Sequence, residues 1–151
     1  ALGCQLTYLT NRERADHPEE SDGAQPVMWD DELSGVARSY SERMCDEGFF
    51  DHLDPDGFGI EVRLQEAGIL YVKAGENLAR GSQLSPGNVI RMFMDEPSCW
   101  PNHRALLLDN DFTHSGAGVA FCGDRRVYTQ LFATYDPDDL RDDPNEFCLG
   151  P

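Results

Sequence analysis

The chain has 151 residues, 40% of them hydrophobic, so one globular domain is expected and a disordered chain is excluded. It carries 12 basic and 28 acidic side chains, a formal net charge of −16. Nucleic acid and anionic membranes are bound through cationic contacts, so this charge argues against nucleic acid as a partner and favours cations. No stretch approaches the roughly 20 apolar residues of a membrane helix, and we expect a monomer without a transmembrane segment.

Five cysteines are scattered along the chain: Cys4, Cys45, Cys99, Cys122 and Cys148. None belongs to a CxxC pair, which argues against a zinc ribbon or a thioredoxin-like site. Scattered cysteines in a small chain favour an oxidising compartment and one or two disulfides, with connectivity open and at least one cysteine left over. The sequence begins without Met and shows no signal-peptide pattern, so we expect a mature or trimmed form and infer export from the cysteines.

Two helices are predicted near the start of the chain, over residues 3–15 and from Asp30 or Asp31 to Gly48. The second has the stronger pattern, because apolar residues recur at helical spacing: Leu33, Val36, Ala37, Tyr40 and Met44. The segment 16–26 between them is polar and contains Pro and Gly, which predicts a loop.

The middle of the chain predicts shorter elements. A short helix is expected over 59–67, ended by Gly68, and residues 71–80 have a mixed pattern that is partly extended. Ser85 followed by Pro is typical of a helix start, and that helix is expected to run to about Asp95.

The last third predicts a β-hairpin after a short helical turn at 103–108. Its strands are expected over 115–123 and 126–135, with Gly123 and Asp124 in the turn. The acidic, Pro-containing tail 136–151 is expected to be irregular and tied down through Cys148. Helices in both halves together with a hairpin indicate an α+β fold.

Four side chains are candidates for a functional site by type and setting. His52 lies in the turn-rich loop 49–57, Glu76 lies between Gly and Asn, Glu96 precedes a Pro, and His103 follows the loop 98–102. Two imidazoles and two carboxylates can bind a divalent metal or act as general acid and base. Their separations of 24, 20 and 7 residues do not by themselves predict that they converge.

A series of segments resembles, in order and spacing, bacterial members of the CAP superfamily: FFDHLDPDG, AGENLARG, FMDEP, NHRALL, SGAGVAF and YTQLFA. This superfamily includes the cysteine-rich secretory proteins, antigen 5 and pathogenesis-related 1 proteins. The resemblance runs from about Leu6 to Ala133, and it implies one CAP domain over 1–135, with the tail 136–151 packed on it. It also implies a three-layer α-β-α sandwich and a secreted or cell-envelope location.

The resemblance implies that the family's His–Glu–Glu–His tetrad falls on His52, Glu76, Glu96 and His103. The two histidines are then expected to bind a divalent metal, zinc by preference, with Glu76 and Glu96 reached through water. The chain departs from its relatives in two respects. Many bacterial members have a Ser-Pro-Gly-His-Arg run here and lack the second Glu, whereas this chain keeps Glu96 and has SCWPN before His103. Animal and plant members place the second His in a GHYTQ-like strand, whereas here it belongs to NHRALL and the YTQ segment lacks it. Trp100 and Cys99 are expected to wall the cleft.

Other polar residues are expected to serve structure. Asn77 is interpreted as satisfying backbone groups and Arg104 as an ion-pair partner, while His17 and His114 are predicted to lie at the surface. One face of the strand containing Tyr128 is expected to form the floor of the cleft.

Three functions are compatible with these residues. The first is an extracellular binding module that holds a divalent metal ion in the His/Glu cleft. The second is a metal-dependent hydrolase of peptidase type, with Glu76 or Glu96 as general base, and the third is a lipid or sterol carrier. The ligand, whether small molecule, peptide or lipid, is not determined by the sequence.

Overall fold

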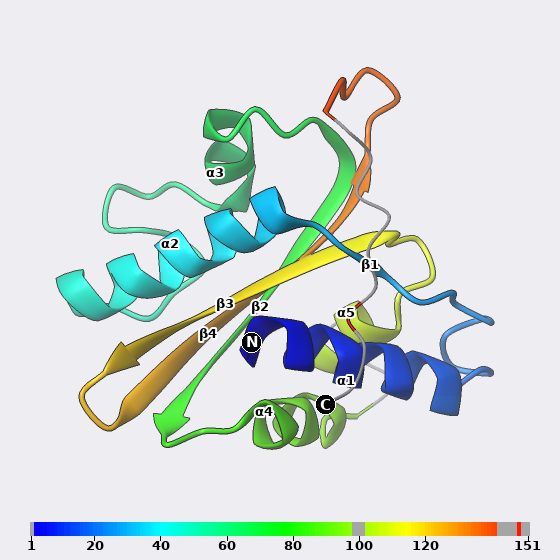
Figure 1. The fold of residues 1–151 in the computed structure, drawn as a ribbon, viewed down its shortest axis with the longest axis horizontal. Helices are drawn as coiled ribbons and strands as arrows, with labels where there is room; N and C mark the ends of the chain where they lie inside the picture. The colour runs from blue at the N-terminus through cyan, green and yellow to red at the C-terminus, as the bar shows by residue number, and fades with distance from the viewer. Residues whose placement is uncertain (1, 98–101, 142–147, 149–151) are drawn as a thin grey trace.

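The computed structural model describes residues 2–97, 102–141 and 148. Five helices and four strands follow one another along this part of the chain (Figure 1): α1 Leu2–Asp16, β1 Met28–Trp29, α2 Asp31–Glu47, α3 Ile60–Glu66, β2 Tyr71–Ser82, α4 Pro86–Met94, α5 His103–Leu108, β3 His114–Cys122 and β4 Arg125–Tyr135.

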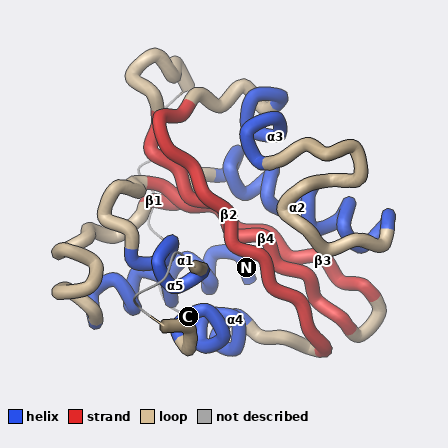
Figure 2. Tube along the Cα trace, turned by 180° about the vertical axis from the view of Figure 1, so that it is seen from behind, coloured by secondary structure: helices blue, strands red, loops and turns tan. Residues whose placement is uncertain are grey.

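The elements form three layers, with the sheet in the middle. Helices α2 and α3 cover one face, and α1, α4 and α5 cover the other (Figures 1 and 2). Side chains of β4 alternate between two hydrophobic cores, since Tyr128 and Phe132 pack under α1 and α4 whereas Leu131 packs against α2 and α3. The predicted α-β-α sandwich is therefore confirmed.

Helix boundaries follow from local capping chemistry. The Asp30 side chain accepts bonds from the first backbone N–H groups of α2, and that helix ends at Gly48 in the left-handed region, with φ of 72°. Ser85 caps α4 in the same way and is followed by Pro in the first turn. These ends, and the short helices α3 and α5, lie where the sequence predicts them.

The sheet has the order β1-β3-β4-β2, so β2 forms one of its edges. Strands β3 and β4 make the predicted hairpin through Gly123, and β2 runs antiparallel to β4, with Asn77 paired to Gln130. Strand β2 is longer than the partly extended segment predicted at 71–80. The two-residue strand β1, parallel to β3, was not predicted.

Two disulfides connect distant parts of the chain. Cys4 on α1 is bonded to Cys148, and Cys45 on α2 is bonded to Cys122 at the end of β3, with Cα–Cα distances of 5.4 and 5.7 Å. Cys99 lies outside the described residues. The expectation of up to two disulfides, one of them through Cys148, is confirmed.

The described part of the C-terminal tail contacts the domain. Asp139 accepts a hydrogen bond from the backbone N–H of Leu70 at 2.9 Å, and Arg141 forms an ion pair with buried Asp30 at 3.1 Å. The boundary expected at residue 135 stays a prediction.

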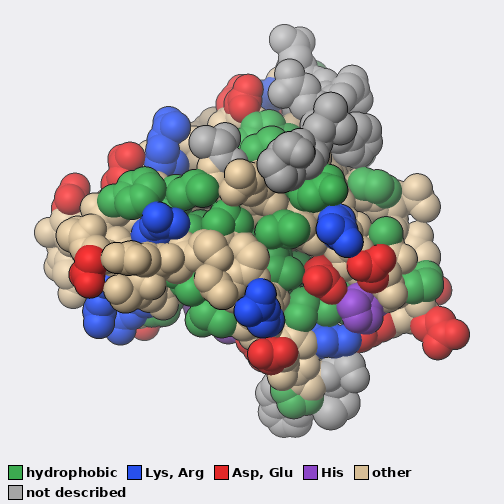
Figure 3. All heavy atoms as spheres, turned by 60° about the horizontal axis from the view of Figure 1, so that its bottom comes forward, with side chains coloured by type: hydrophobic (Ala, Val, Ile, Leu, Met, Phe, Trp, Pro, Cys, Tyr) green, Lys and Arg blue, Asp and Glu red, His purple; other side chains and the backbone are tan. Residues whose placement is uncertain are grey.

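The charge excess is dispersed over the face shown in Figure 3, where acidic side chains lie among basic and hydrophobic ones. Among the described residues, no helix has the length and apolar character required to cross a membrane.

Candidate functional site

His52 and Glu76 form the first of two His–Glu pairs. His52 lies in the loop after α2, where the Tyr40 hydroxyl donates a 2.5 Å hydrogen bond to the backbone carbonyl of Asp51 and so holds the loop. The Nδ1 atom of His52 is 2.8 Å from Oε1 of Glu76 on β2. The imidazole is 56% exposed and the carboxylate only 3%, so Glu76 anchors a ring that faces solvent.

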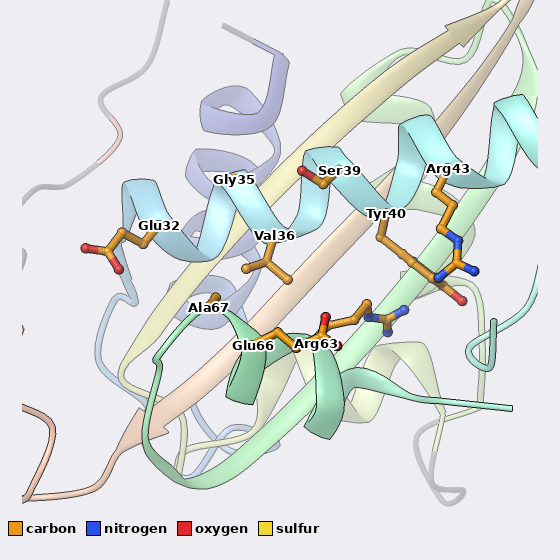
Figure 4. A pocket seen from close by; sticks show the side chains of 9 residues that line it. All are labelled: Glu32, Gly35, Val36, Ser39, Tyr40, Arg43, Arg63, Glu66 and Ala67. Carbon is orange, nitrogen blue, oxygen red and sulfur yellow. The ribbon is translucent and has the colours of Figure 1, made fainter. Parts of the chain in front are cut away.

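Arg63 of α3 fixes the buried carboxylate from the other side. Its Nη2 donates to Oε2 of Glu76 at 2.6 Å, and its guanidinium lies 3.4 Å from the centre of the Tyr40 ring. Arg63 also borders a second hollow of about 550 Å³ between α2 and α3 (Figure 4). Because Arg63 and His52 each bind one oxygen, Glu76 is held in one orientation.

Glu96 and His103 form the second pair. Glu96 follows α4, and its Oε1 contacts Nδ1 of His103 while its Oε2 accepts a 3.1 Å bond from the His103 backbone N–H. Asn102 caps α5 by accepting from the N–H of Ala105 at 3.0 Å, which places His103 at the first position of that helix. The ring stacks on Phe93, with centroids 4.8 Å apart.

A buried amide network supports the second pair. Asn77 on β2 donates to the backbone carbonyl of His103 and to Oε1 of Gln130, both at 3.2 Å. Gln130 in turn donates to the hydroxyl of Thr10 on α1 at 2.8 Å. The predicted structural role of Asn77 agrees with these bonds. Its Oδ1 is buried and has no hydrogen-bond partner among the described residues.

One hollow of about 700 Å³ brings the four predicted side chains together. Its described lining consists of His52, Glu76, Asn77, Glu96, Asn102, His103, Ala105, Leu106 and Asp109. Successive residues of a strand point to opposite faces of the sheet, so Glu76 meets α3 while Asn77 meets α5. The hollow therefore spans the edge of β2, with one His–Glu pair on each side.

The contacts assign the ring nitrogens. An ionised carboxylate only accepts hydrogen bonds, so each imidazole donates through Nδ1 and, when neutral, carries its lone pair on Nε2. The hydrogen bond to Glu76 raises the pKa of His52 above its ordinary value, although partial burial opposes the shift.

The other sequence predictions have mixed outcomes. Arg104 forms the predicted ion pair, with Glu20 at 2.6 Å. His114 is not a surface residue: it is 5% exposed at the start of β3, because it packs on the Tyr135 ring. Tyr128 and Gln130 lie beneath the site rather than among the residues that line it.

Two predictions about the cleft wall fall on Cys99 and Trp100, which lie outside the described residues. Sequence reasoning missed Arg63. No signal near it in the sequence marks it as a partner of Glu76, because the two residues meet only through the packing of α3 against β2.

Residues 7–132 match the model of the cysteine-rich secretory protein family, CAP. The chain belongs to this family. It is 36% identical over 128 residues to YkwD, an uncharacterized protein of Bacillus subtilis, and 34% identical to YlbC, an uncharacterized membrane protein of the same organism. The matches cover 85% of this chain but only 45% and 33% of those two proteins, so this CAP domain spans less than half the length of these relatives.

Solved CAP structures agree with the fold. An extracellular protein containing an SCP domain from Bacillus anthracis superposes with a TM-score of 0.73 at 29% identity, covering 87% of this chain and 39% of that one. An outer surface protein from Borrelia burgdorferi gives the same TM-score at 18% identity, covering 87% and 90%, and supports the fold alone.

Proposed function

We propose that this CAP domain is an extracellular binding module that holds a divalent metal ion, zinc by preference, between His52 and His103. The observation that supports this best is the pairing of each imidazole Nδ1 with a carboxylate. Histidine ligands of metals commonly donate their second nitrogen to a carboxylate, which orients the ring and strengthens the ligating Nε2. In this arrangement Glu76 and Glu96 orient the two imidazole ligands through their Nδ1 atoms.

The donor set fits a metal with open positions. Among the described residues, no group of three or more His, Cys, Asp or Glu side chains is arranged to hold a metal ion. Two imidazoles therefore leave several positions for water or ligand, and the unpartnered Oδ1 of Asn77 is an acceptor for such a water. When bound, the metal supplies a Lewis-acidic positive charge for an oxygen of the ligand.

An extracellular location is supported by two observations. The Bacillus anthracis relative is described as extracellular, and the two disulfides suit an oxidising compartment.

The alternative functions gain no specific support. A hydrolase would use Glu76 or Glu96 to take up a proton, but both oxygens of Glu76 already accept bonds from Arg63 and His52. The hollow between α2 and α3 is bordered by two arginines and two glutamates, which is not the apolar groove that a lipid requires.

Zinc titration of the metal-stripped protein by calorimetry tests the proposal. We expect one saturable site in the wild type and loss of binding by at least about tenfold in His52→Ala and in His103→Ala, because each variant removes one of two ligands. His17→Ala is the matched control, since that histidine directly follows α1 and its ring contacts the backbone carbonyl of Glu13. Equal affinity in all four proteins would contradict the proposal.

The pH dependence of zinc binding is a second prediction. The metal binds neutral imidazole, so affinity falls as pH drops through the pKa values of the ligands, by about tenfold per pH unit for each proton displaced. Since Glu76 raises the pKa of His52, the fall should begin above pH 6.5, its ordinary value. Titrations from about pH 8 to about pH 5.5 measure this. In Glu76→Gln the fall should begin at lower pH, and a flat profile in the wild type would rule out imidazole ligands.

A further inference from the structure

We propose that the same hollow takes an extended, positively charged peptide segment, which adds to the sheet as a further strand along the open edge of β2. This inference rests on the proposed function, because it assigns a class of ligand to the hollow that holds the two His–Glu pairs. It follows from the backbone of β2 rather than from the metal.

Strand β2 borders a strand on one side only. Within the described residues it pairs with β4 along its whole length and has no second strand on its other side (Figure 2). In an antiparallel pair, alternate residues direct N–H and C=O toward the partner and the others direct them away. Half of the backbone groups of β2 therefore face outward.

The ladder shows which residues face outward. The backbone carbonyl of Ser115 accepts a hydrogen bond from the N–H of Asp30, which follows β1. The backbone N–H and C=O of Ser115 therefore point away from β4, and those of the next residue, Gly116, point toward it. Gly116 pairs with Leu131, so the backbone groups of Leu131 point toward β3. Those of the preceding residue, Gln130, therefore point toward β2.

Gln130 pairs with Asn77, so the odd-numbered residues of β2 bond to β4. The bond from Gln83 N–H to the Asp124 carbonyl agrees with this alternation. Glu76 and Leu78 therefore direct their N–H and C=O groups to the open edge, and Glu76 is the residue at which the edge borders the hollow.

The two residues that carry these outward backbone groups are largely buried, and the groups themselves are unpaired in the described chain. Glu76 is 8% exposed and Leu78 is 6% exposed, yet no residue of the described chain makes a hydrogen bond to the backbone N–H or C=O of either. Enclosed backbone groups are nearly always paired with protein, water or a ligand. An extended peptide offers a donor and an acceptor in the required alternation, which is the basis of recognition by strand addition.

The surroundings favour positive side chains on that peptide. Side chains of an added strand would alternate between the face of His52 and the face of Asn77 and His103. Glu96 and Asp109 border the hollow, and the net charge of −16 attracts cationic segments. A neutral or acidic peptide of the same length is expected to bind less tightly.

The test uses NMR on the isotope-labelled, metal-free protein with a capped pentapeptide of alternating lysine and valine at millimolar concentration. We expect the backbone amide signals of Glu76 and Leu78 to shift and their hydrogen exchange to slow by about tenfold. The matched control is the same peptide with every backbone nitrogen methylated, which keeps the side chains but removes the donors. A second control replaces lysine by glutamate.

Shifts at Glu76 and Leu78 that the methylated peptide does not produce support the inference. The inference is overturned if these amides do not move, or if both peptides move them equally. Repeating the titration with zinc separates the two proposals. If the peptide binds but zinc does not, strand addition is supported and the metal site is contradicted. If zinc binds but the amide signals do not move, the metal site is supported and strand addition is contradicted.

Discussion

Replacing Arg14 by alanine is expected to lower the free energy of unfolding by about 4 kcal/mol. Arg14 is 1% exposed on α1, and its guanidinium donates to four backbone carbonyls, those of Gln25, Leu107, Asp109 and Phe112, at 2.8 to 3.3 Å. Burial lowers its pKa, and the charge of Asp109 opposes this shift. Removing the side chain leaves enclosed carbonyls without donors, which destabilises the folded state.

Chemical denaturation followed by tryptophan fluorescence measures this effect. Arg12→Ala is the matched control, because Arg12 is an exposed arginine on the same helix, and we expect it to change stability by less than about 0.5 kcal/mol. Arg14→Lys should recover only part of the stability, since one ammonium group cannot bond to four carbonyls. A loss in Arg14→Ala no larger than in Arg12→Ala would show that the bonds contribute nothing.

Gly118→Ala is expected to destabilise the protein by about 3 kcal/mol. Helix α2 lies directly on the backbone of β3, and a Cβ at Gly118 would lie 2.3 Å from both the Cα and the backbone nitrogen of Arg38. Neither atom belongs to a flexible side chain, so the helix itself must move. Because α2 leads into the loop that carries His52, we also expect weaker zinc binding in any Gly118→Ala protein that folds.

Gly35→Ala in α2 is the matched control for this second prediction. A Cβ at Gly35 meets no atom within 4 Å, and alanine is favoured over glycine inside a helix by about 0.5 to 1 kcal/mol. The two substitutions add the same methyl group, one at the contact of β3 with α2 and one at an open position of α2, and should change the unfolding free energy in opposite directions. Thermal unfolding measures both variants. Equal stability of Gly118→Ala and Gly35→Ala would contradict the close approach of α2 to β3.

The helices of this CAP domain could be predicted because their signals are local. Asp30 and Ser85 satisfy backbone groups two or three residues away, and apolar spacing on α2 specifies the face that it buries. The hairpin at Gly123 is specified in the same way. Strand β2 was harder to predict, since Glu76 and Asn77 are polar yet buried and disrupt the alternation expected of a strand.

The four site residues were identified by their resemblance to a family, not by their spacing. His52, Glu76, Glu96 and His103 come from three loops or helix ends and one strand, and only the packed sheet brings them to one hollow. Arg63, which fixes Glu76, and the outward direction of the Glu76 backbone depend on the same packing and have no counterpart in the sequence pattern.

The helix ends, the hairpin turn and the chemical types available at the site could be predicted, because they depend on neighbouring residues along the chain. Which polar side chains are buried depends instead on the packing of distant segments. Arg14 is buried because backbone carbonyls from distant segments accept its hydrogen bonds, and His114 is buried because it packs on the Tyr135 ring. Arg12, on the same helix as Arg14, stays exposed. Burial of a polar group is stable only where partners converge, and convergence is a property of the folded chain.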